Sequence, residues 1–148
     1  YKQETIWSCG AAVMKIVLES LGIKRSEKQL IKLLKISKKY GVANEAFPAL
    51  AERYRLDYFV ERNGKIDDLK KYLRKGYRII VCFYVVSEKV NHHAVVIKIN
   101  SKKITLIDPW FGPKHSYPII YFKKIWNATS DKLIILIAVL LIKQPFCK

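Results

Sequence analysis

Residues 11–21 read Ala-Ala-Val-Met-Lys-Ile-Val-Leu-Glu-Ser-Leu, a stretch that places apolar side chains on nearly every side of a helix. A helix of this kind is enclosed by the rest of a fold, whereas a surface helix keeps one polar face. Gly22 follows as a helix C-cap, because glycine readily adopts the left-handed conformation that ends a helix. The sequence therefore predicts a buried helix near the N-terminus, around which the other elements pack.

Three further helices and one strand are expected between this helix and Gly76. The helices cover Ser26–Ser37, Asn44–Arg55 and Ile66–Arg74, and the strand covers Asp57–Glu61. Ser26 is placed to cap the first of these helices, since serine at this position accepts a hydrogen bond from a free backbone N–H. Pro48 is tolerable only in the first turn of its helix. Gly76 ends the last one.

Beyond Gly76 the pattern changes to β-strands. Runs rich in Val, Ile and Tyr predict strands at Tyr77–Val86, His93–Asn100, Lys103–Asp108, Tyr117–Tyr121 and Lys132–Leu141, with a short helix at Phe122–Ala128. A tight turn at Asn100-Ser101 joins two of these strands in a hairpin. Helices followed by an antiparallel sheet indicate the α+β class. With 51% apolar residues, the chain is expected to form one domain over residues 1–148.

The chain is strongly basic, with 28 Lys and Arg against 12 Asp and Glu and a net charge of +16. Such a charge favours anionic partners. Only six of the basic residues are Arg, however, and nucleic-acid readers rely on the planar fork of arginine. Lys28, Lys32 and Lys35 also follow the solvent face of a predicted helix. We therefore expect no nucleic-acid partner.

The longest apolar run, Leu133–Ile142, is too short for a transmembrane segment, which needs about 20 residues. It indicates a buried strand or helix instead. The sequence leaves the oligomeric state and the compartment open, with a cytoplasmic location favoured over secretion.

Three cysteines are present, and no two of them lie close together in the sequence as in zinc or dithiol redox sites. No metal or other cofactor is expected. Cys82 lies in an apolar strand and is interpreted as structural, and Cys147 lies next to the C-terminus. Cys9 stands in the first turn of the buried helix, where the positive helix end favours a thiolate. Position alone leaves it either a nucleophile or a small core residue.

Two adjacent histidines, His92 and His93, stand at the start of a predicted strand whose hairpin partner ends in Asp108. Two paired strands can hold a histidine and a carboxylate side by side. The carboxylate then fixes the imidazole tautomer and stabilises the imidazolium, as in a catalytic triad. A His-His pair can also bind a metal or lie on the surface, and Asp-Pro is a common plain turn.

The segment Tyr1–Ala12 resembles the N-terminal signature of the bacteriocin-processing, double-glycine leader peptidases and their stand-alone relatives, within the papain-like cysteine peptidases. That signature is a Gln, five residues, and then Cys-Gly at the start of a helix. The strand that begins at His93-Ala94-Val95-Val96 is similar to the family's His-x-Val-Val strand, and Ile107–Gly112 to its Asp-Pro-x-x-Gly turn. Ala11 differs from the Pro that many relatives have there, which removes no reacting group.

The resemblance implies a papain-like α+β fold and a peptide or protein substrate. It assigns Cys9 as the nucleophile, His93 as the base, Asp108 as the residue that orients the base, and Gln3 as the oxyanion donor. The implied reaction is amide hydrolysis through a thioester, in this family often after small residues such as Gly-Gly.

His93 is chosen over His92 because successive strand residues face opposite ways, so that only one is expected to meet Cys9. The face of His93 includes Val95 and Ile97, and His93 aligns with the family pattern. Two other functions stay open at this point. The same triad serves acyltransferases, and a non-catalytic binding module could use the basic surface with the triad as scaffold.

Overall fold

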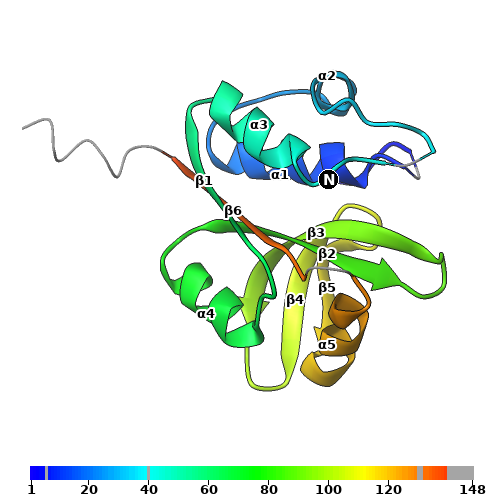
Figure 1. Ribbon diagram of the computed structural model, residues 1–148, viewed down its shortest axis with the longest axis vertical. Coiled ribbons are helices and arrows are strands. Elements are labelled where there is room, and N and C mark those ends of the chain that lie inside the picture. Colours follow the sequence, from blue (N-terminus) through cyan, green and yellow to red (C-terminus); the bar gives the residue numbers. More distant parts are fainter. Residues whose placement is uncertain (6, 40, 130–131, 140–148) are drawn as a thin grey trace, which may run out of the picture.

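The centre of the protein is a six-stranded antiparallel sheet in the strand order β1-β6-β2-β3-β4-β5 (Figure 1). The computed structural model describes residues 1–5, 7–39, 41–129 and 132–139. The strands are β1 Leu56–Glu61, β2 Arg78–Val85, β3 Val90–Ile99, β4 Lys103–Asp108, β5 Gly112–Pro118 and β6 Ile134–Val139. In β2 every residue from Ile79 to Phe83 is buried. Both faces of the central strands are therefore covered.

Helices cover the two faces of the sheet unequally (Figure 1). They are α1 Cys9–Ser20, α2 Glu27–Leu33, α3 Ala46–Arg53, α4 Ile66–Arg74 and α5 Ile119–Asn127. The first three lie together on one side, and α4 and α5 lie on the other. This arrangement forms two hydrophobic cores that share the sheet as a common wall.

The two cores follow from the alternation of side chains along each strand. On the first face, Ile80 and Val95 pack with Met14 and Leu18 of α1. On the second face, β2, β3 and β4 pack against aromatic residues of α5 such as Phe122. Successive residues of β3 therefore belong to different cores, which decides the surroundings of the two histidines described below.

The predicted buried helix is confirmed as α1, in which residues 10–14 are fully buried or nearly so. The cap at Ser26 is also confirmed, since its hydroxyl accepts from the Gln29 N–H at 3.1 Å while the Gln29 side chain accepts from the Ser26 N–H at 2.8 Å. This helix ends at Leu33 and not at Ser37, because Lys35 adopts a left-handed conformation with φ 54°. Helix α4 and strand β4 have the predicted bounds.

The strand predicted at Tyr117–Tyr121 is wrong over most of its length. Strand β5 ends at Pro118, and α5 begins at Ile119. The apolar residues Phe122, Ile125 and Trp126 recur at helical spacing and are buried together, so packing favours a helix here. The C-terminal strand lies at Ile134–Val139. Cys147 and the last two residues of the predicted strand fall outside the described residues.

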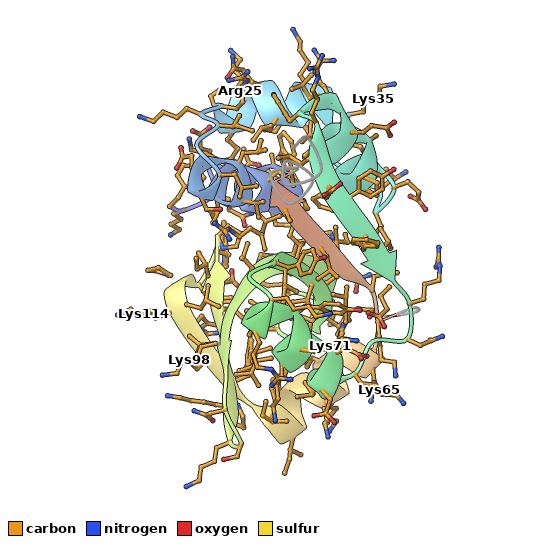
Figure 2. All side chains as sticks on the ribbon, turned by 90° about the vertical axis from the view of Figure 1, so that its left-hand side faces the viewer. Arg25, Lys35, Lys65, Lys71, Lys98 and Lys114 are labelled. Carbon is orange, nitrogen blue, oxygen red and sulfur yellow. The ribbon has the colours of Figure 1, made fainter. Side chains whose placement is uncertain are left out.

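Basic side chains are distributed over many elements of the surface. Figure 2 shows labelled examples that lie far apart, including Lys35 after α2, Lys71 in α4 and Lys114 in β5. None of the helices in the described ranges is long and apolar enough to cross a membrane.

Candidate active site

Cys9 is the first residue of α1, and this helix packs against β3. Its side chain opens into a cleft of about 490 Å³. The walls of this cleft come from Trp7 before α1, from strands β2 and β3, and from Lys38, Lys39, Gly41, Val42 and Asn44. The start of a helix carries partial positive charge, which favours a thiolate at this position. The buried helix therefore brings a cysteine to the strand that carries both histidines.

His93 is in direct contact with Cys9, as predicted. Its Nδ1 lies 3.6 Å from the Cys9 Sγ, and its Nε2 lies 3.2 Å from the Asn44 Oδ1. The imidazole also packs against the Phe47 ring, with centroids 5.1 Å apart. The sequence analysis placed Asn44 at the start of a predicted helix and gave it no role in the site, and its position just before α3 was the signal that could have indicated one.

His92 is the histidine that pairs with Asp108. The His92 Nε2 lies 2.7 Å from the Asp108 Oδ1, and both side chains are buried. The same oxygen accepts backbone N–H bonds from Trp110 at 2.8 Å and Phe111 at 3.0 Å. Asp108 thus holds the following turn and the His92 imidazole in one hydrogen-bonded unit.

The predicted pairing of Asp108 with His93 is therefore wrong, and a β-bulge explains why. A regular hairpin that pairs Ile99 with Ile104 would place Asp108 opposite Val95, on the face of His93. Between Val96 and Lys98 the register shifts by one residue, so that Val95 pairs with Ile107. Asp108 then follows one step further, opposite Ala94 and on the face of His92.

Both histidines line the Cys9 cleft, and both lie beyond the part of β3 that pairs with β4. The register between β3 and β4 runs only from Ile99 back to Val95. At His92 and His93 the edge of β3 that faces β4 is unpaired, so side chains on either face can be approached from that edge. Alternation along the strand consequently does not exclude one histidine from the site.

The electrostatics of the site favour a thiolate next to imidazolium. Burial raises the pKa of the Cys9 thiol, but hydrogen bonds with His92 and His93 outweigh it and lower this pKa to about 5. Burial lowers the pKa of His92, but Asp108 and Cys9 raise it to about 9. For His93, contacts with Cys82 and Cys9 overcome burial and raise the pKa to about 10.

The pKa of Asp108 is lowered, even though burial opposes this, because His92 and two backbone N–H groups bond to its carboxylate. A charged carboxylate is thereby kept next to the His92 imidazolium. Its second oxygen, Oδ2, has no hydrogen-bond partner among the described residues.

Gln3 lies near His92, in a segment that is bonded to the turn after Asp108. Its backbone N–H donates to the Pro109 carbonyl at 2.7 Å, and its side-chain Nε2 donates to the Thr5 carbonyl at 2.6 Å. With His92 and Trp110 it lines a smaller hollow of about 190 Å³. A carboxamide has two N–H groups, so one donor remains for another acceptor.

Cys82 is buried in β2 directly opposite His93. It also contributes to the wall of the Cys9 cleft, as does Trp7. No three His, Cys, Asp or Glu side chains are grouped to hold a metal ion within the described ranges.

The sequence matches one family model, described as the Peptidase_C39 like family, over residues 1–134. A comparison with curated proteins finds no match.

Solved structures similar to this chain include the peptidase domain of Streptococcus ComA, a bi-functional ABC transporter involved in quorum sensing. The TM-score is 0.77 at 21% identity, covering 93% of this chain and 96% of that one. A double glycine motif protease from an AMS/PCAT transporter, in complex with the leader peptide, has a TM-score of 0.74 at 17% identity, with 94% and 89% covered. A C39-like peptidase from Bacillus anthracis has a TM-score of 0.75 at 14% identity, with 91% and 92% covered. These likenesses confirm the predicted papain-like α+β fold.

Proposed function

Because this chain belongs to the Peptidase_C39-like family, we propose that it is a cysteine peptidase with Cys9 as nucleophile, His92 as base and Asp108 as the residue that orients the base. The observation that carries this proposal is the bond of 2.7 Å between the buried Asp108 carboxylate and the imidazole of His92, which lines the same cleft as Cys9. Gln3 is the proposed donor to the oxyanion, together with the Cys9 backbone N–H.

The proposed reaction has two steps. In the first, the Cys9 thiolate attacks the carbonyl carbon of the peptide bond, and the negative charge on the carbonyl oxygen is stabilised by the oxyanion donors. The imidazolium of His92 then gives its proton to the departing amine, which leaves a thioester on Cys9. In the second, His92 takes a proton from water and the hydroxide adds to the thioester. The acid and the Cys9 thiolate are then released, and His92 is left as imidazolium, as at the start.

We propose His92 as the base in place of His93 because the two imidazoles donate to different side chains. The carboxylate of Asp108 stabilises a positive imidazolium, whereas the neutral amide of Asn44 stabilises it less. His93 is then a second imidazole whose contact with Cys9 helps to hold the thiolate.

The proposed substrate is a peptide with small residues, such as Gly-Gly, on the acyl side of the cleaved bond. Two features support this substrate class. Gly41 and Val42 lie in the wall of the Cys9 cleft, and a double glycine motif protease of similar fold binds a leader peptide.

The proposal is tested with synthetic peptides that contain Gly-Gly or, in a matched control, Val-Val at the same place. We expect cleavage after Gly-Gly, measured by mass spectrometry, and its complete loss in Cys9→Ala but not in Cys82→Ala. Cleavage that survives Cys9→Ala would overturn the assignment of the nucleophile. Adding an amine nucleophile distinguishes hydrolysis from acyl transfer, because a transferase would give the amide product in place of the acid.

A further inference from the structure

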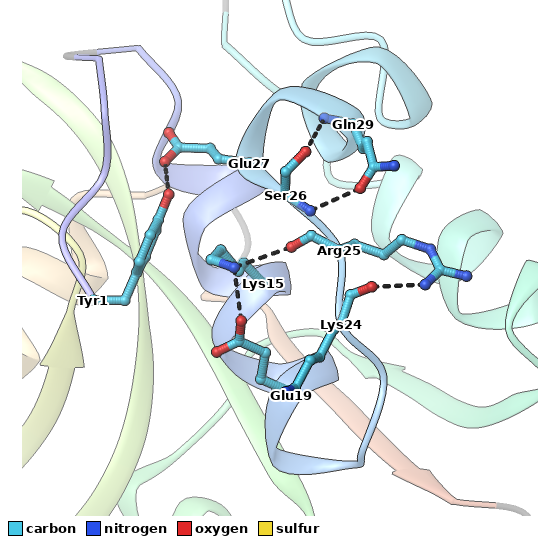
Figure 3. A network of polar contacts seen from close by, with 8 residues as sticks. All are labelled: Tyr1, Lys15, Glu19, Lys24, Arg25, Ser26, Glu27 and Gln29. Atoms are coloured by element: carbon cyan, nitrogen blue, oxygen red, sulfur yellow. Dashed lines mark hydrogen bonds and ion pairs between the residues drawn. The ribbon is translucent and has the colours of Figure 1, made fainter.

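A buried carboxylate outside the cleft gathers the segment that leads to Cys9. Glu27, the first residue of α2, is only 1% exposed. Its carboxylate accepts hydrogen bonds from the Tyr1 phenol, the Ser8 hydroxyl and the Glu4 backbone N–H, the last at 3.1 and 3.0 Å to its two oxygens. Figure 3 shows the phenol of Tyr1 pointing at this carboxylate.

These partners are all neutral donors, so the arrangement is not an ion pair. Burying a carboxylate is costly unless several hydrogen bonds replace its lost hydration. Here the hydrogen bonds come from Tyr1 and Glu4 near the N-terminus and from Ser8, just before Cys9. The carboxylate therefore holds Glu4 and Ser8 close to each other, because moving either residue away would leave a buried carboxylate oxygen without its donor.

The two anchored residues are the sequence neighbours of the proposed oxyanion donors. Glu4 follows Gln3, and Ser8 precedes Cys9. On its other side Gln3 is fixed to the Pro109 carbonyl, and the Ser8 hydroxyl accepts from the Thr5 N–H at 3.3 Å. The distance between the Gln3 amide and the Cys9 N–H thus depends on the positions in which Glu27 holds Glu4 and Ser8.

Resting on the proposed function, we propose that Glu27 is a positioning residue that sets the geometry of the oxyanion donors from outside the cleft. It touches neither the thiol nor the histidines through any contact described above. Its removal is therefore expected to weaken stabilisation of the oxyanion while the Cys9 thiolate keeps its two imidazole partners.

The test compares two reactions of the same thiolate. Peptide cleavage passes through an oxyanion, whereas alkylation of Cys9 by iodoacetamide displaces iodide and forms none at the donor site. In Glu27→Gln the new NH₂ group faces donors that need an acceptor. We expect kcat for peptide cleavage to fall about 10- to 100-fold, less than the roughly 10²- to 10³-fold loss that follows complete removal of one oxyanion donor. The alkylation rate of Cys9 should stay within about threefold, because its two imidazole partners remain.

Glu19→Gln is the matched control. Glu19 is a carboxylate of α1 that is paired with Lys15 at 2.6 Å and is far more exposed than Glu27 (Figure 3). This variant should leave both rates unchanged. In a double variant, Gln3→Ala should cost less in the Glu27→Gln background than alone, because both changes affect the same donor.

A parallel loss of cleavage and alkylation in Glu27→Gln, or no loss in either, would overturn the proposal. If Glu27→Gln does not fold, the test uses Ser8→Ala, which removes the hydrogen bond from Ser8 to Glu27 and leaves the carboxylate its other donors. Its ratio of cleavage to alkylation should fall about three- to tenfold, the equivalent of one hydrogen bond, and an unchanged ratio would contradict the inference. A wild-type protein that cleaves no peptide, by contrast, would refute the proposed function itself.

Discussion

The two faces of β3 each supply one histidine to the same cleft, and they differ in what lies behind the imidazole. On the face covered by α1 and α3, His93 bonds to the neutral amide of Asn44 and packs on Phe47. On the opposite face, His92 bonds to the Asp108 carboxylate and packs edge-on against Phe83. Neighbouring residues of identical type thus have second partners of different charge.

This difference shows that contact with a thiol is not enough to identify a catalytic base. Both imidazoles lower the pKa of Cys9. A base must also return its proton during the reaction, and the charge of its second partner controls how well the imidazolium forms. The comparison therefore separates two roles, proton transfer for His92 and support of the thiolate for His93.

The largest expected effect comes from removing one imidazole at a time. His92→Ala should lower kcat/KM for a cleavable peptide by about 10²- to 10⁴-fold, the contribution of a general acid–base group. His93→Ala should cost about tenfold or less, because Cys9 keeps its proton-transfer partner. Peptide cleavage followed by mass spectrometry measures both. An inactive His93→Ala together with an active His92→Ala would restore the base that sequence reasoning chose.

A smaller effect is expected from changing the second partners. Asp108→Asn should lower turnover by about 10²-fold or more, since an amide can hold the ring but loses the charge that stabilises imidazolium. Asn44→Ala should cost only about two- to tenfold, the worth of one neutral hydrogen bond. Circular dichroism and thermal melting check that each variant folds. Equal losses in the two variants would remove the distinction between the faces.

The smallest effect is a displacement of the pH profile. The thiolate–imidazolium state exists above the Cys9 pKa of about 5 and below the His92 pKa of about 9, so cleavage should rise through the first and fall through the second. Asp108 raises the pKa of His92, so Asp108→Asn should move the upper limb to lower pH, whereas Asn44→Ala should leave it in place. Iodoacetamide labelling of Cys9 should show the lower limb and no fall at high pH, because the thiolate persists there. An upper limb that moves in Asn44→Ala alone would assign proton transfer to His93.

Much of the architecture was determined by local sequence. The apolar stretch behind Cys9 specifies a buried helix whatever surrounds it, and the Ser26 cap and the bounds of α4 follow from residues a few positions apart. The order of Gln3, Cys9, a histidine pair and Asp108 was also enough to indicate the family. The helix, its cap and the bounds of α4 depend on contacts between near neighbours, which propensity and spacing describe well.

Only the tertiary structure decided which histidine meets Asp108, and which residues support the site from a distance. A one-residue bulge near Ile97 reverses the face on which Asp108 lies, and the run Val95–Lys98 contains no glycine or proline that would have indicated it. The apolar pattern of β3 could not indicate which histidine faces Asp108 either, because both faces of this strand are covered. In the sequence, Asn44 and Glu27 likewise appear as ordinary polar residues beside helices. Packing brings Asn44 to His93, 49 residues away, and Glu27 to the segment before Cys9, up to 26 residues away.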